Sequence, residues 1–225
     1  MDSKIVNREI RTHVWPLLAD AGFRSTTSRT AWRHHDDRVD VVNFQSFNAR
    51  TADALGVTTF SFAVNLGCFL TYVPPQCPLR RVEGGRPFPQ EHECQLRGSI
   101  APSARLAARN PGVWSVDRSG RNLAACMEDV VRRVPEALAW FARFDDRREV
   151  LRILLHDEES MSTVWGFGAS PSPVRAYLVG HVALALGETE LARRELGNAV
   201  RSGCFSGLFS SVEEACRRAE AAPGA

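Results

Sequence analysis

Amide and guanidinium side chains on neighbouring predicted strands are the residues of this chain best suited to hold a ligand. Asn43 and Gln45 alternate with apolar residues in one segment, Asn65 does so in a second, and Arg97 lies in a third. If these strands are adjacent, their alternation puts all four side chains on the face opposite the apolar residues. Amides offer donors and acceptors, whereas the planar guanidinium fork suits a carboxylate or phosphate. This face is predicted to bind an extended peptide, an anion or a partner protein; the alternatives are a solvent-exposed face with cross-strand hydrogen bonds, or a face covered by C-terminal helices.

A second group of residues combines soft metal ligands. Cys77, His92 and Cys94, with Cys68 upstream, lie within or beside a proline-rich segment. Structural zinc sites use two tight ligand pairs, and here only His92 and Cys94 are close in sequence. We therefore expect reduced thiols and a loop histidine here, and no bound metal or other cofactor.

Sequence motifs of the common enzyme classes are missing. The chain contains no G-x-S-x-G elbow, P-loop, H-E-x-x-H or EF-hand spacing. Gly166-Phe167-Gly168 lacks the third glycine of a dinucleotide fingerprint, and the run from His34 to Asp37 is typical of a solvated turn between strands. No catalytic residue is assigned on this basis.

Charge and apolar composition exclude two classes of partner. The chain has 28 basic and 26 acidic residues, a formal net charge of +2, whereas nucleic-acid binders usually carry a stronger and clustered positive excess. Its apolar runs are too short to span a bilayer. The first residues include early acids and no apolar core of signal-peptide length. We expect a cytoplasmic protein of bacterial type whose six cysteines form no disulfides, and we expect neither nucleic-acid nor membrane binding.

The elements that must position these side chains form an α+β arrangement. Residues 5–21 have helical spacing, with Pro16 expected to kink or restart the helix. Strands are predicted over residues 30–34, 39–47, 58–66 and 94–100, with a short one over 113–116. The sheet is predicted to be antiparallel with one buried face, and the first helix is its natural cover.

The remainder of the chain is predicted to be helical. After residue 122 we expect a helix broken or bent at Pro135, a second helix near residues 150–155, and short final helices. This divides the chain into an α+β domain, residues 1–145, and a helical extension, residues 146–225. The stretch from Pro74 to Pro89 carries five prolines and is expected to be neither helix nor central strand.

A helical hairpin over residues 173–200 has small and apolar residues at the intervals of a tetratricopeptide repeat. These positions are Gly180, Gly187, Ala192, Leu196 and Ala199. Small residues let two antiparallel helices approach closely, and Leu196 is expected to fill the gap between them. Only one such unit is visible, so a single packed hairpin is expected rather than a repeat array.

The order of motifs in the first 145 residues resembles a known family. The resemblance rests on a leading helix that ends in residues 17–24 and on the segments 32–33, 42–46, 62–67, 94–97 and Trp114. This series, over about residues 5–145, is similar to domain of unknown function 4304. The family's function is not established, so the resemblance implies a fold and no reaction. Ser99 stands where a second basic residue is expected, and the helices beyond Asp146 are additional.

These features together favour a non-catalytic module that binds a protein partner or a small anionic ligand through the polar sheet face. Two alternatives remain open at this point. One is an enzyme of an unrecognised class that uses the same face, and the other is an immunity-type protein that neutralises a toxin.

Overall fold

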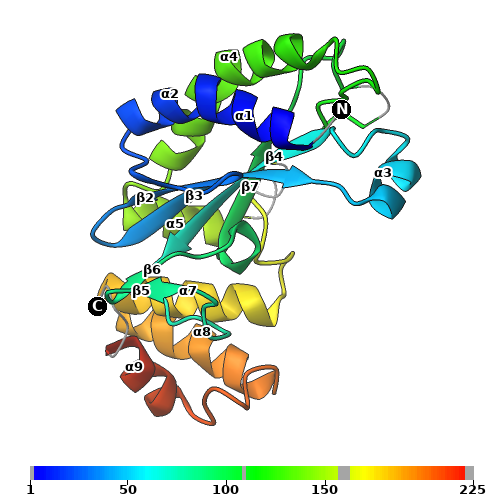
Figure 1. Cartoon of the computed structure of the whole chain (residues 1–225). Coiled ribbons are helices and arrows are strands. Elements are labelled where there is room, and N and C mark those ends of the chain that lie inside the picture. Colours follow the sequence, from blue (N-terminus) through cyan, green and yellow to red (C-terminus); the bar gives the residue numbers. More distant parts are fainter. Residues whose placement is uncertain (1–2, 108–109, 157–162, 221–225) are drawn as a thin grey trace. The chain divides into compact units, whose positions relative to one another are not determined.

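The computed structural model describes residues 3–107, 110–156 and 163–220 and has the predicted α+β class (Figure 1). An antiparallel five-stranded sheet has the strand order β1-β2-β3-β4-β7. Its strands are β1 (Ser25–Thr26), β2 (Thr30–His34), β3 (Arg38–Ser46), β4 (Phe62–Leu70) and β7 (Leu96–Ile100). A separate hairpin pairs β5 (Val82–Glu83) with β6 (Arg86–Pro87).

Helices precede, interrupt and follow the strands. They are α1 (Ser3–His13), α2 (Trp15–Asp20), α3 (Ala49–Leu55), the 3₁₀-helix η1 (Glu91–Glu93), α4 (Leu123–Ala142), α5 (Arg147–Leu155), α7 (Pro173–Ala185), α8 (Thr189–Arg201) and α9 (Val212–Glu220). Over the described ranges, no helix is both long enough and apolar enough to span a membrane.

The chain forms two compact units whose segments alternate along the sequence. The first unit contains residues 1–33, 40–66 and 98–140, and the second contains residues 34–39, 67–97 and 141–225. The sequence, in contrast, predicts a single division between residues 145 and 146.

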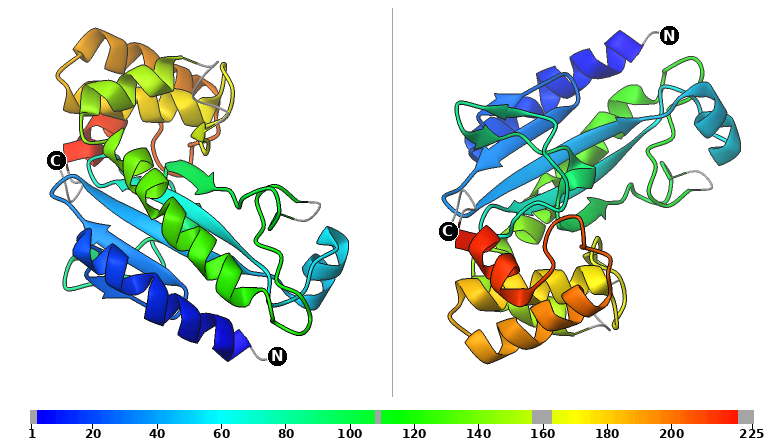
Figure 2. Two further views of the ribbon diagram at one scale, coloured as in Figure 1. Left: turned by 90° about the horizontal axis from the view of Figure 1, so that it is seen from above. Right: turned by 90° about the horizontal axis from the view of Figure 1, so that it is seen from below.

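The core of the first unit lies between its strands and helices α1, α2 and α4, which cover one face of those strands (Figure 2). Phe44 of β3 and Phe62 of β4 are buried on this face, with ring centroids 5.7 Å apart. Trp15 of α2 meets the ring of Phe44 edge-on at 5.5 Å, and Trp114 stacks on Phe62 at 5.7 Å. Successive side chains of a strand point to opposite faces, and in β3 and β4 the aromatic rings accordingly face the helices, as the alternation of apolar and polar residues predicts.

Two prolines in helical segments behave differently. α1 ends at His13 and α2 begins at Trp15, with Pro16 in its first turn, so the predicted restart is confirmed. Pro135 lies inside α4, which continues without interruption from Leu123 to Ala142. Of the two predicted effects of Pro135, a break or a bend, the break is therefore wrong.

Helices α7 and α8 form the predicted hairpin of the second unit, and they approach closely where small residues allow it. A Cβ atom added to Gly180 would lie 2.7 Å from Cγ of Leu196, and Leu196 is fully buried. Tyr177 of α7 stacks on Phe205 and Phe209, with ring centroids 4.8 and 5.9 Å away. A close helix–helix contact and an aromatic stack thus both contribute to the packing of α7.

Candidate functional site

The polar face of the first unit lies on β3 and β4, on the side away from α1, α2 and α4. Gln45 is exposed, and Asn43 and Asn65 are half-buried, while the apolar residues between them face the helices. Because adjacent side chains of a strand point to opposite faces, the same alternation that builds the core also presents these amides.

Hydrogen bonds join two of these amides across the strands. Asn65 Nδ2 donates to Gln45 Oε1 at 2.8 Å, and Asn43 Nδ2 donates to Thr30 Oγ1 of β2 at 2.9 Å. Within the part of the chain that the structure describes, Asn43 Oδ1, Gln45 Nε2 and Asn65 Oδ1 have no hydrogen-bond partner. Two acceptor oxygens and one donor nitrogen on this face thus lack any partner among the described residues, and all three belong to uncharged amides.

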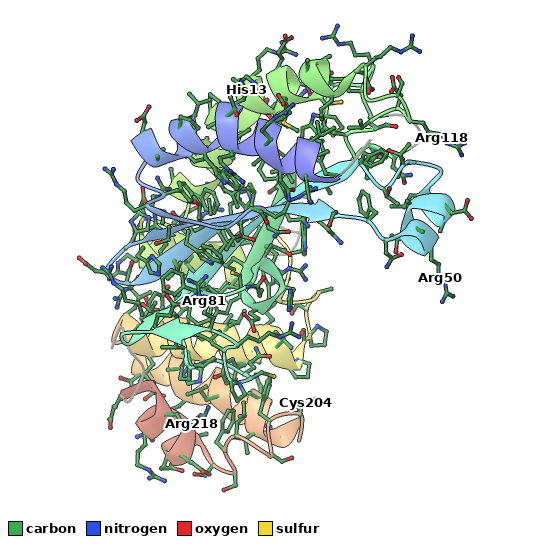
Figure 3. The ribbon with its side chains drawn as sticks, in the orientation of Figure 1. His13, Arg50, Arg81, Arg118, Cys204 and Arg218 are labelled. Carbon is green, nitrogen blue, oxygen red and sulfur yellow. The ribbon has the colours of Figure 1, made fainter. Side chains whose placement is uncertain are left out.

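Helix α3 lies next to this face at one end of the strands. Its N-terminus is capped by Asn48, whose side chain accepts a hydrogen bond from the Thr51 amide at 2.8 Å. A small apolar cluster that includes Phe47, Ala52 and Val113 packs against Ala63 of β4. On α3 the side chain of Arg50 projects into solvent (Figure 3).

Arg97, the fourth residue of the predicted site, belongs to the second unit, and its guanidinium group is already hydrogen-bonded to a carboxylate. Its Nε donates to Glu91 Oε1 at 2.7 Å and its Nη2 to Glu91 Oε2 at 3.2 Å. Its backbone forms a two-way bridge with Trp165, with both N···O distances at 2.8 Å. Glu91 therefore fills the guanidinium fork for which the sequence predicts the carboxylate or phosphate of a ligand.

A buried carboxylate on the helix side of the first unit has a structural role. Asp129 Oδ2 accepts hydrogen bonds from Trp114 Nε1 and from the Ser103 amide, both at 3.0 Å, and Asp129 Oδ1 accepts one from Arg132 at 3.2 Å. Burial by itself would raise the pKa of Asp129, but these hydrogen bonds hold it below its ordinary value. Both oxygens of this carboxylate accept hydrogen bonds from the protein. Asp129 therefore holds the loop before α4 in place and does not bind a ligand.

The candidate metal ligands Cys77, His92 and Cys94 line one pocket of about 380 Å³ in the second unit. Cys68 is fully buried and does not line it. Across residues 3–107, 110–156 and 163–220, no group of three or more potential ligands is placed to hold a metal ion. All six cysteines are free thiols, and Cys77 and Cys204 are exposed.

The turn after β2 separates its charged residues instead of clustering them around an ion. His34 Nε2 lies 2.8 Å from the carbonyl oxygen of Pro87, and His35 Nε2 accepts from the buried Arg38 at 3.3 Å. Asp37 accepts from Arg147 Nε at 3.1 Å. His34, His35 and Asp37 therefore have separate partners. Arg38 and Arg147, the partners of His35 and Asp37, lie outside the motif and were not identified from the sequence.

His181 of α7 is a buried titratable residue that no sequence motif indicates. Only 1% of it is exposed, its ring meets Tyr177 edge-on at 4.5 Å, and neither ring nitrogen has a hydrogen-bond partner among the described residues. Burial, reinforced by the positive charge of Arg218 on α9, lowers its pKa to about 4. The signal in the sequence is a histidine within the apolar helix of the hairpin, one residue after Gly180.

No family model, no curated protein and no solved structure matches this chain. The similarity of residues 5–145 to domain of unknown function 4304 accordingly stays a prediction from the sequence motifs.

Proposed function

We propose that this protein is a non-catalytic binding module whose polar sheet face holds an extended segment of a partner protein. The observation that carries the proposal is the set of unfilled hydrogen-bonding atoms on β3 and β4: Asn43 Oδ1, Gln45 Nε2 and Asn65 Oδ1. A face with both donors and acceptors matches the alternating N–H and C=O groups of an extended peptide backbone.

The charge of the face favours a peptide over a small anion. Its three amides are neutral, and Arg97, the cation expected to attract an anion, has both ends of its fork on Glu91. A cytoplasmic location suits this proposal, since free thiols such as those of Cys77 and Cys204 persist in a reducing compartment.

Peptide selection with matched variants tests the proposed function. Peptides are selected from a random displayed library against the immobilised wild-type protein, and the affinity of synthetic copies is measured for the Gln45→Ala/Asn65→Ala double variant. We expect at least a tenfold loss of affinity in the double variant and none in Asn198→Ala, which removes an exposed amide from α8.

The side-chain amides also provide a direct readout of where a peptide binds. In a nitrogen-15 spectrum, the NH₂ signals of Gln45 and Asn65 are expected to shift on peptide addition, while that of Asn198 stays in place. Selected peptides that bind the double variant as tightly as the wild type would show that the polar sheet face is not the binding surface.

A further inference from the structure

The pocket that holds the candidate metal ligands has cysteines on two different segments. Residues 75–80 form one wall and residues 92–95 another. Gly166 and, on α7, Val174 and Leu178 complete the lining. Cys77 and Cys94 thus face one space of about 380 Å³ from two parts of the chain.

Hydrogen bonds anchor the segment that carries Cys77 at Pro74 and at Arg80 and Arg81, but not at the residues between them. At one end Tyr177 Oη donates to the carbonyl oxygen of Pro74 at 2.7 Å, and at the other the Phe88 amide donates to the carbonyl oxygen of Arg81 at 3.0 Å. Arg81 also stacks over the ring of Phe88 at 4.3 Å and is labelled in Figure 3. Residues 75–79, all of which the structure describes, form no hydrogen bond to any other described residue. This segment can therefore move without breaking a hydrogen bond of its own.

The segment that carries Cys94 is fixed. The Cys94 amide donates to the carbonyl oxygen of Glu91 at 3.1 Å, and Cys94 itself is 5% exposed. A Cβ atom on Gly67 would lie 2.7 Å from Cys94 Sγ, so the absence of a side chain at Gly67 makes room for this sulfur. The sulfur is held between β4 and the pocket.

A contact between the two segments brings the cysteines into the same neighbourhood. The Arg80 amide donates to Glu93 Oε1 at 3.4 Å, and Arg80 Nε lies 3.9 Å from the same oxygen. Arg80 is three residues from Cys77, and Glu93 directly precedes Cys94.

From this arrangement we propose that Cys77 and Cys94 are an oxidation site at which hydrogen peroxide produces a disulfide that closes the pocket. The thiolate of exposed Cys77 attacks peroxide: an S–O bond forms, the O–O bond breaks, and the departing hydroxide takes a proton and leaves as water. The Cys94 sulfur then attacks the sulfenic acid of Cys77, so that the S–S bond forms, the S–O bond breaks and a second water leaves. Two thiols lose two electrons, and peroxide accepts them.

Disulfide geometry sets how closely Cys77 and Cys94 must approach each other. Bonded cysteines have Cα atoms roughly 4.4–6.8 Å apart. In the proposed disulfide, residues 75–79 are the part of the pocket lining that adjusts to reach this separation, because they form no hydrogen bond to another described residue.

Peptide mapping under non-reducing conditions tests the proposal. The full chain is treated with hydrogen peroxide, blocked with N-ethylmaleimide and digested with trypsin. Cys77 falls in the peptide 51–80 and Cys94 in the peptide 82–97, because trypsin does not cleave before Pro87. We expect these two peptides to be joined in the wild type, and the link to vanish on reduction.

Variants assign the bond to individual sulfurs. Peptide 51–80 also contains buried Cys68, so loss of the link in Cys77→Ser identifies Cys77 as the partner. Cys94→Ser and, as a second variant, Cys94→Ala are expected to leave a sulfenic acid on Cys77 that dimedone traps. The matched control Cys204→Ser removes the other exposed cysteine, which is labelled in Figure 3, and is expected to retain the link.

Three outcomes overturn the proposal: a link that survives in Cys77→Ser, a link only between separate chains, or oxidation of Cys77 to a sulfinic acid without any link to Cys94.

Discussion

Replacing His181 with leucine is expected to remove an acid-dependent loss of stability. The imidazole is neutral in the folded protein at pH 7, because burial beside Arg218 lowers its pKa to about 4, whereas the ordinary value is 6.5. Above pH 6.5 the ring is neutral in both states and contributes no pH dependence. Between pH 6.5 and 4 the unfolded chain binds a proton that the folded protein does not, so the free energy of unfolding falls as the pH falls.

The magnitude follows from the difference between the two pKa values. Each pH unit in this window costs about 1.4 kcal/mol of stability, so His181 accounts for a loss of about 3 kcal/mol between pH 7 and pH 4. At pH 7 the leucine variant is expected to be at least as stable as the wild type, because two buried ring nitrogens without partners are removed.

The free energy of unfolding of both proteins is measured by urea titration at pH 7.0, 6.0, 5.0 and 4.5. The difference between the two values at each pH isolates His181, because the titration of all other groups cancels. His92→Leu is the matched control, since it makes the same substitution at an exposed histidine. An equal loss of stability with acid in the wild type and in His181→Leu would refute the assignment of a buried neutral imidazole.

Four further outcomes are expected. Phe62→Ala should lower the free energy of unfolding by about 3–5 kcal/mol in a denaturant titration, because the ring is fully buried against Phe44 and Trp114. Thr59→Val, at an exposed position, should change it by less than about 0.5 kcal/mol; a large change would show that this position is not solvated. Gly180→Ala should lower the melting temperature, at a cost of about 1–3 kcal/mol, since the added methyl would overlap α8; an unchanged melting temperature would contradict this close approach. Elemental analysis of the purified protein should find no stoichiometric zinc, and one zinc per chain would contradict the ligand spacing argument.

Two kinds of sequence pattern predicted parts of the fold correctly: the alternation of apolar and polar residues in strands, and the spacing of small residues in the helical hairpin. The core face of β3 and β4 follows the first pattern, and the approach of α8 at Gly180 follows the second. Element ends were less predictable. β4 begins at Phe62 and not at residue 58, because the Ser61 amide closes a turn onto the Thr58 carbonyl and Thr58 Oγ1 donates to the Val116 carbonyl at 2.6 Å. A hydrogen bond between residues far apart in the chain produces no repeating pattern in the sequence, so the start of β4 could not be predicted.

The continuity of α4 through Pro135 has a similar cause. A proline inside a helix removes one backbone hydrogen bond, at a cost of about 3 kcal/mol. A prediction from the local sequence considers this cost and not the tertiary packing that offsets it. Val130, Val134 and Ala137 on the same helix are buried, and burial of such a face stabilises a helix more than intrinsic propensity does. Tertiary packing therefore outweighs the local penalty.

The candidate site was only partly predictable for a related reason. The amides of Asn43, Gln45 and Asn65 follow from strand alternation. The pairing of Arg97 with Glu91 depends instead on the 3₁₀ turn η1, which positions Glu91 to meet the arginine side chain. Whether a charged side chain can bind a ligand depends on such tertiary contacts, and the amino-acid sequence alone does not show them.

The alternation of the two compact units along the chain has a consequence for synthesis on the ribosome. The first unit lacks its last segment until residue 140 has emerged, and by then residues 34–39 and 67–97 of the second unit have already left the tunnel. Those two segments must wait for the final 85 residues, 141–225, before their own unit is complete. A nascent chain stalled, or a gene cut, near residue 145 would thus release a fragment carrying exposed pieces of an unfinished unit, a natural target for chaperones and proteases.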